Sequence, residues 1–466
     1  MAASRLLLTA AVAALLAGCS LAPAYAPPAT PVAPAFKEQG PWTPAAPADA
    51  QSRGQWWEMF SDPVLDDLEA RAERANPGLA AAVAAYDQAR AFAAQARAGL
   101  VPEIDGGATA QRTRRSDNQP LRVGGPDQYS NNQVGVSLAY EIDLWGRLRN
   151  LAQSAGDRAQ ASAADLRSMR LSLQADLADD YLSLRGLDSQ LRLLQATAVA
   201  YARALELTQI RHDGGNATGL DVARAQTQLS TAKAQITDVA AQRALMEHAI
   251  AALVGESAST FSLTPVDTAL PQPRVAVSAP STLLQRRPDI AAAERRAAAA
   301  NADIGVARAA MFPALTLDGS AGWQNSGGAN LLTAPNTFWM VGPQLVGAIF
   351  DGGRRKAGVQ AARAAFDEAS ANYRGVVLNA FRDVEDQIAL ANRLAAEAKD
   401  QTDAVTAARR TEELADIRYR QGVATYLDVV TAQTAALTAE QAAIQLTTLR
   451  LQASVNLTRA LGGAWS

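Results

Sequence analysis

Few residues in this chain have a type and a spacing that could support chemistry. Its 466 residues include one cysteine, Cys19, and two histidines, His212 and His248, which stand 36 positions apart. A single cysteine can form neither an intrachain disulfide nor a multi-cysteine metal site. Two distant histidines favour surface or packing roles over a metal centre or a proton relay. We therefore expect the chain not to be an enzyme and to hold no metal.

The residues before Cys19 indicate a covalent modification. Residues 6–18 form an apolar run of thirteen, which is too short for a permanent transmembrane helix and has the length of a signal-peptide core. The run ends in Leu-Ala-Gly before Cys19, and this ending resembles the bacterial lipobox. The alternative is an ordinary signal peptide followed by an incidental cysteine.

The lipobox implies cleavage after residue 18 and a lipid anchor on the new N-terminus. A diacylglycerol would be attached to the Cys19 sulfur and an acyl chain to its amine, and we expect no cofactor besides these groups. Several acyl chains are enough for stable anchoring. Ser20 follows in place of the aspartate that retains many lipoproteins in the inner membrane, so the predicted destination is the outer membrane.

Two aspartates stand in a repeated local pattern. Thr218-Gly-Leu-Asp221 and Thr425-Tyr-Leu-Asp428 each place an acid three residues after a threonine. This spacing resembles a capping box at the start of a helix, where a negative charge also suits the helix dipole. Gly215 and Gly422 precede the two segments and predict tight turns between helices.

The composition limits the architectures that can position these residues. Hydrophobic residues make up 48% of the chain but aromatic residues only 5%, so alanine and leucine supply much of the apolar content. Such a composition suits long, closely packed helices better than several separate globular cores. The 43 basic and 46 acidic residues give a net charge of −3 and no basic surface for nucleic acid.

The chain repeats itself. Residues 76–82 match residues 287–293, and residues 98–102 match residues 309–313, both at a shift of 211 positions. Farther along the shift is 207 positions, and the matched segments are Gly146-Arg147 with Gly353-Arg354, Gly215 with Gly422, Leu220-Asp221-Val222 with Leu427-Asp428-Val429, and Gly255 with Gly462. A sustained shift predicts a tandem duplication.

The duplication and the composition divide the chain into five segments. We predict a signal peptide (1–18), a lipidated, proline-rich N-terminal strap and equatorial segment (19–62), a first repeat (63–262), a linker (263–280) and a second repeat (281–466). Each repeat has the order helix, two strands, long helix and returning helix.

The predicted strands carry an alternating pattern. In residues 132–143 and 315–324, apolar residues alternate with polar or small ones over about ten positions, the length that a tilted transmembrane strand needs. A soluble hairpin would alternate similarly. The polar stretches 113–131 and 325–337 are expected to be loops on the outer surface. No other stretch approaches 18 uninterrupted apolar residues, so a membrane crossing would require strands closed into a barrel.

The predicted helices begin and end at proline, threonine and glycine. Short helices are expected from Pro77 and Pro288, since proline suits the first helical turn. Apolar residues spaced four and three apart predict two helices of about 65 residues, each about 100 Å long. Returning helices are predicted over 218–255 and 425–462, and the short helix of each repeat can stack end-on with its returning helix.

Four strands in one chain cannot close a barrel. The smallest outer-membrane barrels have eight strands, so closure requires several chains. Three chains with four strands each would give twelve strands, and the same threefold operation would arrange the helices in a tube. The strand count alone requires an oligomer without fixing the number of chains.

The sequence resembles the TolC family, specifically the lipid-anchored OprM/NodT-like outer-membrane factors of tripartite efflux pumps. The motifs that carry the resemblance are Leu16-Ala17-Gly18-Cys19, Trp56-Trp57 with Phe60-Ser61-Asp62-Pro63, Arg286-Arg287-Pro288-Asp289-Ile290, Phe350-Asp351-Gly352-Gly353-Arg354, and Tyr419-Arg420-Gln421-Gly422 with Tyr426-Leu427-Asp428-Val429. The resemblance covers essentially the whole chain. It implies a mixed α/β membrane protein, a homotrimer whose 12-stranded outer-membrane β-barrel has four strands per chain and continues into a long periplasmic α-helical barrel, with an equatorial domain.

The resemblance also implies a function and partners. The chain would be a passive exit duct for drugs or other small solutes, working with a periplasmic adaptor (membrane fusion) protein, an inner-membrane RND-type transporter and outer-membrane lipid. The alternatives are a duct for type I protein secretion or for metal ions, although six scattered methionines form no metal-export cluster. A lipidated periplasmic coiled-coil adaptor is an alternative from another class, but it would not need two strand–loop–strand units.

The resemblance finally implies a periplasmic gate at the tips of the helical hairpins. It points to Asp428, with Arg418 and Tyr419 as tip contacts and with Asp221 as the counterpart in the first repeat. In a trimer each aspartate would form a ring of three carboxylates that selects for cations. The capping box explains both aspartates without a gate, so both interpretations stay open. Some family members carry an arginine where this chain has Ala424 and an acid where it has Thr431.

Overall fold

The computed structural model describes residues 20–30, 35–38, 54–118, 126–266, 268–273, 275, 286–327 and 330–463. The chain forms two compact units. Unit one contains residues 1–29, 85–163 and 292–374, and unit two contains residues 30–84, 164–291 and 375–466. The predicted signal peptide, Cys19 and parts of the proline-rich strap lie outside the described residues.

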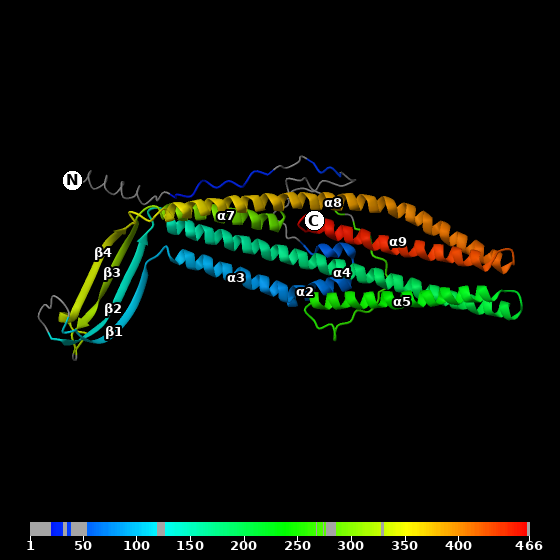
Figure 1. Ribbon diagram of the computed structural model, residues 1–466, viewed down its shortest axis with the longest axis horizontal. Coiled ribbons are helices and arrows are strands. Elements are labelled where there is room, and N and C mark those ends of the chain that lie inside the picture. Colours follow the sequence, from blue (N-terminus) through cyan, green and yellow to red (C-terminus); the bar gives the residue numbers. More distant parts are fainter. Residues whose placement is uncertain are drawn as a thin grey trace. The chain divides into compact units, whose positions relative to one another are not determined.

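Helices dominate the described chain (Figure 1). The α-helices are α2 Pro63–Ala75, α3 Pro77–Ala98, α4 Arg147–Asp213, α5 Gly219–Leu253, α7 Pro288–Ala309, α8 Arg354–Arg420 and α9 Tyr426–Ala460, and the short 3-10 helices are η1 Trp56–Phe60 and η2 Ala334–Asn336. Proline begins α2, α3 and α7, where its missing N–H costs no helical hydrogen bond. None of the described helices is both long and apolar enough to span a membrane.

The helices occur in pairs of equal length. α3 and α7 have 22 residues each, α4 and α8 have 67 each, and α5 and α9 have 35 each. The first residues of α4 and α8 are 207 positions apart, as are those of α5 and α9. The long helices and their returning helices run side by side as two hairpins, α4–α5 and α8–α9 (Figure 1). The predicted short, long and returning helices are therefore confirmed.

The sheet belongs to unit one. Strands β1 Glu103–Arg114, β2 Gln128–Ile142, β3 Ala314–Asn325 and β4 Thr337–Val346 pair in that order, and every pair is antiparallel. β3 contains the predicted strand 315–324, and β2 contains the predicted strand 132–143 except for Asp143, whose carboxylate instead accepts from the N–H groups of Leu148 and Arg149 at the start of α4. The predicted loop over 113–131 is wrong at both ends, because Thr113 pairs with Tyr129 and Arg114 with Gln128. Backbone hydrogen bonds extend both strands past the alternating segment, since polar side chains do not hinder the ladder.

The strand register gives the sheet an apolar face and a polar face. Directly paired residues point to the same side of a sheet. The apolar face carries Val134, Val136 and Leu138 of β2 together with Trp323 of β3 and Trp339, Val341 and Leu345 of β4. The polar face carries Gln133, Ser137 and Glu141 of β2 with Gln324, Ser320 and Thr316 of β3. Trp339 is 78% exposed, so the described residues leave the apolar face uncovered at this position.

The core of unit two forms around α2, a helix that the sequence analysis did not predict. Phe60, Leu65 and Leu68 are fully buried there and pack in one cluster with Leu177 and Tyr181 of α4. The cap of α2 is buried too. Asp62 accepts hydrogen bonds from the Val64 N–H (3.0 Å) and from the Tyr181 hydroxyl (2.7 Å), and it forms an ion pair with Arg185. A charge buried in this way is compensated because it has both a cation and two hydrogen bonds.

Each short helix begins where a returning helix ends, as predicted, and both junctions lie in unit two. Asn76 Nδ2 donates to the carbonyl oxygen of Leu253, the last residue of α5, at 2.8 Å. Arg287 Nη1 donates to the carbonyl oxygen of Ala460, the last residue of α9, at 3.2 Å. The last carbonyl groups of a helix have no partner within it, so these side chains satisfy groups that would otherwise stay unpaired.

Candidate functional site

The tips of the two helical hairpins are built alike. Gly215 and Gly422 have φ angles of +73° and +77°, a conformation that favours glycine because a Cβ atom is disfavoured there. The N–H group that follows each glycine donates to a carbonyl group five positions back. Asn216 donates to Arg211 at 2.7 Å, and Val423 donates to Arg418 at 3.0 Å. This is the Schellman ending of a helix, and it reverses the chain within a few residues. The two predicted turns are confirmed at Gly215 and Gly422.

A capping box begins each returning helix, as predicted. Asp221 Oδ2 accepts a hydrogen bond from the Thr218 N–H at 3.1 Å, and the Thr218 hydroxyl accepts one from the Asp221 N–H at 3.2 Å. The corresponding distances for Asp428 and Thr425 are 2.8 and 3.4 Å. The threonine and the aspartate thus satisfy two N–H groups at each helix start.

Asp428 keeps its charge although it is used as a cap. Hydrogen bonds from the Thr425 side chain and backbone, and then the positive charge of Arg418, lower the pKa of the Asp428 carboxyl below its ordinary value of 3.8. Its side chain is exposed at the tip. The carboxylate is therefore ionised at neutral pH and open to solvent.

Tyr419 is packed between the two hairpins rather than free at the tip. Tyr419 is 8% exposed, and its ring centroid lies 5.5 Å from that of Tyr426, in a cluster with Ala225 and Val429. The guanidinium group of Arg211 lies 4.5 Å from the Tyr419 ring centroid, and Arg211 Nη1 donates to the Tyr419 carbonyl at 3.3 Å. A cation over an aromatic face is an attractive contact. Within one chain, this contact joins the end of α4 to the end of α8.

Arg211 is a tip residue that the sequence analysis missed. The repeat contains the signal that could have found it, because a shift of 207 positions places Arg211 opposite Arg418. The two arginines have different surroundings. Arg211 contacts Tyr419 of the other hairpin, whereas Arg418 acts on Asp428 of its own hairpin through its charge.

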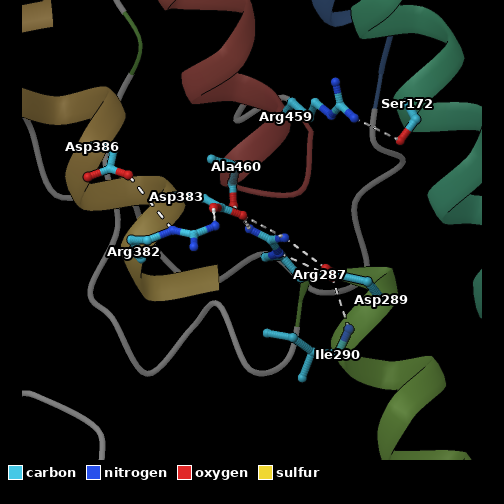
Figure 2. Close-up of polar contacts among 9 residues, drawn as sticks. All are labelled: Ser172, Arg287, Asp289, Ile290, Arg382, Asp383, Asp386, Arg459 and Ala460. Atoms are coloured by element: carbon cyan, nitrogen blue, oxygen red, sulfur yellow. Dashed lines mark hydrogen bonds and ion pairs between the residues drawn. The ribbon is translucent and has the colours of Figure 1, made fainter. Parts of the chain in front are cut away.

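The arginine of the Arg-Arg-Pro-Asp-Ile motif connects three helices in unit two (Figure 2). Arg287 donates to both carboxyl oxygens of Asp289 at 3.1 and 2.7 Å, to Asp383 of α8 at 3.4 Å and to the Ala460 carbonyl of α9. Asp289 in turn accepts from the Ile290 N–H at 2.9 Å. These side chains line a cavity of about 340 Å³. The motif therefore fixes the start of α7 against α8 and α9, and we assign it a positioning role.

The histidines do not assemble a chemical centre. His212 Nδ1 lies 3.0 Å from the Ala217 carbonyl oxygen in the α4–α5 turn. No group of three or more histidine, cysteine, aspartate or glutamate side chains is placed to hold a metal ion in the part of the chain that the structure describes.

Comparison with known proteins gives matches along almost the whole chain. A family model described as "Outer membrane efflux protein" matches residues 69–256 and 279–463. The chain is 36% identical over 433 residues to the pyoverdine export outer membrane protein OpmQ of Pseudomonas aeruginosa, covering 90% of each protein. It is 34% identical to the outer membrane protein OprJ of the same species, covering 97% of this chain and 95% of that protein. The solved structure of the outer-membrane channel OprN matches with a TM-score of 0.86 and 30% identity, covering 96% of this chain and 100% of that chain.

Proposed function

The chain belongs to the family of outer membrane efflux proteins, and from this premise we propose that three copies form a lipid-anchored exit duct for drugs or other small solutes. Family membership confirms the predicted function of an outer-membrane efflux channel and the prediction that the chain is not an enzyme. Channels of this family use no cofactor. In our proposal a periplasmic adaptor and an inner-membrane RND-type transporter deliver the solutes and supply the energy.

The observation that carries the proposal is the open four-stranded sheet. Within the described part of the chain, β1 pairs only with β2 and β4 only with β3, so each outer strand has one edge without a partner. Long unpaired edges favour pairing with another chain. Three sheets joined from β1 to β4 would close a 12-stranded barrel, which lies within the size range of outer-membrane barrels. The apolar face would then contact lipid and the polar face would line the channel.

The paired helices support a duplicated periplasmic part. Residues 63–262 and 281–466 would be the two repeats, because equal helix lengths recur at the sequence shift of 207 positions. Each chain contributes two hairpins, so a trimer would contribute six. Exposed apolar residues recur at equivalent positions of the two tips, such as Leu220 at 58% and Leu427 at 47%. Contacts between neighbouring hairpins would cover such side chains in a tube.

The first described residues support the lipid anchor at Cys19. Residues 20–25 are held along α4 and α7 in unit one by four hydrogen bonds. Two are donated by the segment itself, from the Ser20 hydroxyl to Asn150 (2.9 Å) and from the Tyr25 hydroxyl to Glu294 (2.7 Å). The other two are donated to its carbonyl groups, by Arg308 to Leu21 (3.1 Å) and by Asn301 to Pro23 (2.9 Å). In unit one the C-terminal end of α7 and the N-terminal end of α4 connect to the sheet. An acylated Cys19 would thus be held near the end of the helices from which the membrane strands begin.

The hairpin tips would form the periplasmic gate. Asp428 is exposed and ionised, with Arg418 near it, and a trimer would bring three copies of it around one axis. Asp221 would form the equivalent ring from the first hairpin. Tyr419 and Arg211 would hold the two hairpins of one chain together in the closed state. A ring of carboxylates at a constriction selects for cations.

Native mass spectrometry of the full-length protein in detergent tests the assembly and the anchor together. We expect particles of three chains, each heavier than the polypeptide from Cys19 by a diacylglycerol and an acyl chain. Cys19→Ser should lose the lipid mass. A trimer without lipid would contradict only the anchor, whereas a wild-type monomer would contradict the closed barrel.

A further inference from the structure

Arginine side chains stand on the apolar face of the sheet beyond its last aromatic residue. The rows of this face, read from the helix end toward the loop between β1 and β2, pass from Leu138 and Val341 to Trp339, then Trp323, and then Asn132 beside Asn325. The next rows on the same face contain Arg112, paired with Ser130, and Arg114, paired with Gln128. Lipid-facing strands normally show this order of apolar residues, aromatic girdle and polar residues.

Residue counts place the two arginines at the level of lipid headgroups. Val134, in the row of Trp323, lies eight positions from Ile142 at the other end of the apolar face. At about 3.4 Å per residue and a strand tilt of about 40°, this is about 20 Å in height, close to the apolar band of about 25 Å in outer-membrane barrels. Arg112 lies four positions beyond Ala108, the β1 residue in the row of Val134, which adds about 10 Å in height. The total of about 30 Å exceeds the apolar band of about 25 Å, so Arg112 lies beyond that band.

Both arginines are exposed and accessible to a ligand from outside the chain. Arg114 forms an ion pair with Asp117 at 3.9 Å, and these side chains are 70% and 68% exposed. An exposed pair at such a distance is weak and exchanges readily with another anion. Arg112 is exposed, and no hydrogen bond or ion pair engages its side chain among the described residues. The connection between β3 and β4, residues 326–336, contains no charged residue, whereas Arg112, Arg114 and Arg115 lie at the loop end of β1.

Arg115 is a neighbour that points elsewhere. It follows the last residue of β1, and its guanidinium group lies 5.2 Å from the ring centroid of Tyr129. Tyr129 pairs with Thr113 and is therefore on the polar face. The position, charge and exposure of Arg115 are comparable, but its side chain is engaged on the channel side.

We propose that Arg112 and Arg114 bind the phosphate groups of an anionic lipid in the outer leaflet of the membrane. The planar guanidinium group matches the geometry of phosphate and can donate two hydrogen bonds to it. A lipid headgroup is the occupant that fits, because the side chains lie on the lipid side of the strand at headgroup height. A trimer would present six such arginines around the barrel, which would hold its vertical position in the membrane. This inference rests on the proposed barrel.

The test counts lipid molecules bound to the intact trimer. Full-length protein in detergent is mixed with diphosphoryl lipid A or with the same lipid after removal of its phosphates, and bound lipid is counted by native mass spectrometry. We expect wild-type protein and the matched control Arg115→Gln to bind the diphosphoryl form. The double variant Arg112→Gln/Arg114→Gln should bind it at least about tenfold more weakly, as should wild-type protein offered the dephosphorylated lipid.

Several results distinguish this inference from the proposed function. Equal binding of both lipid forms, or undiminished binding by the double variant, overturns the inference. The proposed exit duct still holds in that case if the trimer conducts ions. Complete displacement of the lipid by an equal concentration of inorganic phosphate also overturns it, because the site would then be one for free phosphate. A wild-type protein that neither assembles nor conducts overturns the duct, and this inference fails with it.

Discussion

Asp428 has a structural role as a helix cap and, in our proposal, an electrostatic role in the gate. Because its pKa is lowered by the Thr425 hydrogen bonds and the Arg418 charge, the cap is fully formed above the ordinary value of 3.8 and is lost as the pH falls through the lower folded-state pKa. Both the cap and the proposed ring of charges should therefore persist at neutral and mildly acidic pH. Only a comparison of variants separates the two roles.

Thr425→Ala and Asp428→Ala make that comparison. Thr425→Ala removes the cap but keeps the carboxylate, so it should destabilise the protein by about 1 kcal/mol and leave cation selectivity unchanged. Asp428→Ala should lower cation selectivity and weaken block by multivalent cations in single-channel recordings. Asp428→Ser, which is polar but uncharged, should behave in the same way. If both Asp428 variants keep wild-type selectivity while thermal stability falls, Asp428 is a capping residue and the gate lies elsewhere.

Glu69 of α2 should make the stability of unit two depend on pH. It is 2% exposed, and neither of its carboxyl oxygens has a hydrogen-bond partner among the described residues. Burial, and then the nearby charges of Glu73 and Asp66, raise its pKa to about 9 from an ordinary value of 4.5. The folded state thus keeps a proton that the unfolded state releases, so stability is fully present below the lower value and is lost as the pH rises toward the higher one.

Glu69→Gln tests this prediction because it keeps the shape of the side chain and removes its titration. As the pH rises from below 4.5 to 7, the unfolding free energy of the wild type should fall by up to roughly 3 kcal/mol because of this group. The variant has no titrating group at this position, so its unfolding free energy should not show this fall. Urea unfolding at a series of pH values measures the difference. Asp87→Asn, at an exposed acid of α3, is the control and should follow the wild type. Parallel curves for Glu69→Gln and the wild type would contradict the assignment.

Among the elements, the contact of Arg211 with Tyr419 is one of the links between the two hairpin tips of one chain, beside the packing of Ala225 against Val429. Arg211→Ala removes a cation–π contact worth about 0.5–1 kcal/mol and a hydrogen bond to a carbonyl. We expect a higher open probability of single channels with an unchanged conductance of the open state. Arg203→Ala, at an exposed position of the same helix, is the matched control. An open probability equal to that of the wild type in both variants would show that this contact does not hold the gate.

The helices could be predicted from the sequence because their ends are encoded locally. Proline at the start of α3 and α7, threonine with aspartate at the start of α5 and α9, and glycine after α4 and α8 each act within a few residues. The strands were predicted less well. β1 contains few apolar residues, and its twelve residues become a strand through pairing with β2 over their whole length. Such pairing depends on the partner, which local patterns do not reveal.

The candidate site was predictable in its turns and caps but not in its contacts between hairpins. Thr425 and Asp428 are three residues apart, so their hydrogen bonds follow from helix geometry. Arg211 and Tyr419 are 208 positions apart and meet only because the two hairpins pack together. The burial of Tyr419 follows from the same packing.

At the scale of the whole molecule, one chain supplies an incomplete sheet. Its strand count could be read from the sequence, and the proposed barrel would need several chains because four strands cannot close. The number of chains and the opening of the gate depend on contacts between copies, which no pattern within one chain determines. Central to the proposed function is that several copies together enclose a conducting duct.

Single-channel recording of the purified wild-type trimer in planar lipid bilayers tests that claim most directly. We expect discrete conductance steps that favour cations and that are blocked by multivalent cations added at the side of the hairpin tips. Asp428→Ala, recorded under the same conditions, should conduct with reduced cation preference. The same recording is made with Arg211→Ala, which should loosen the gate. If trimers are inserted in the bilayer and neither the wild type nor Arg211→Ala shows conductance steps, the claim that this protein is an exit duct is contradicted.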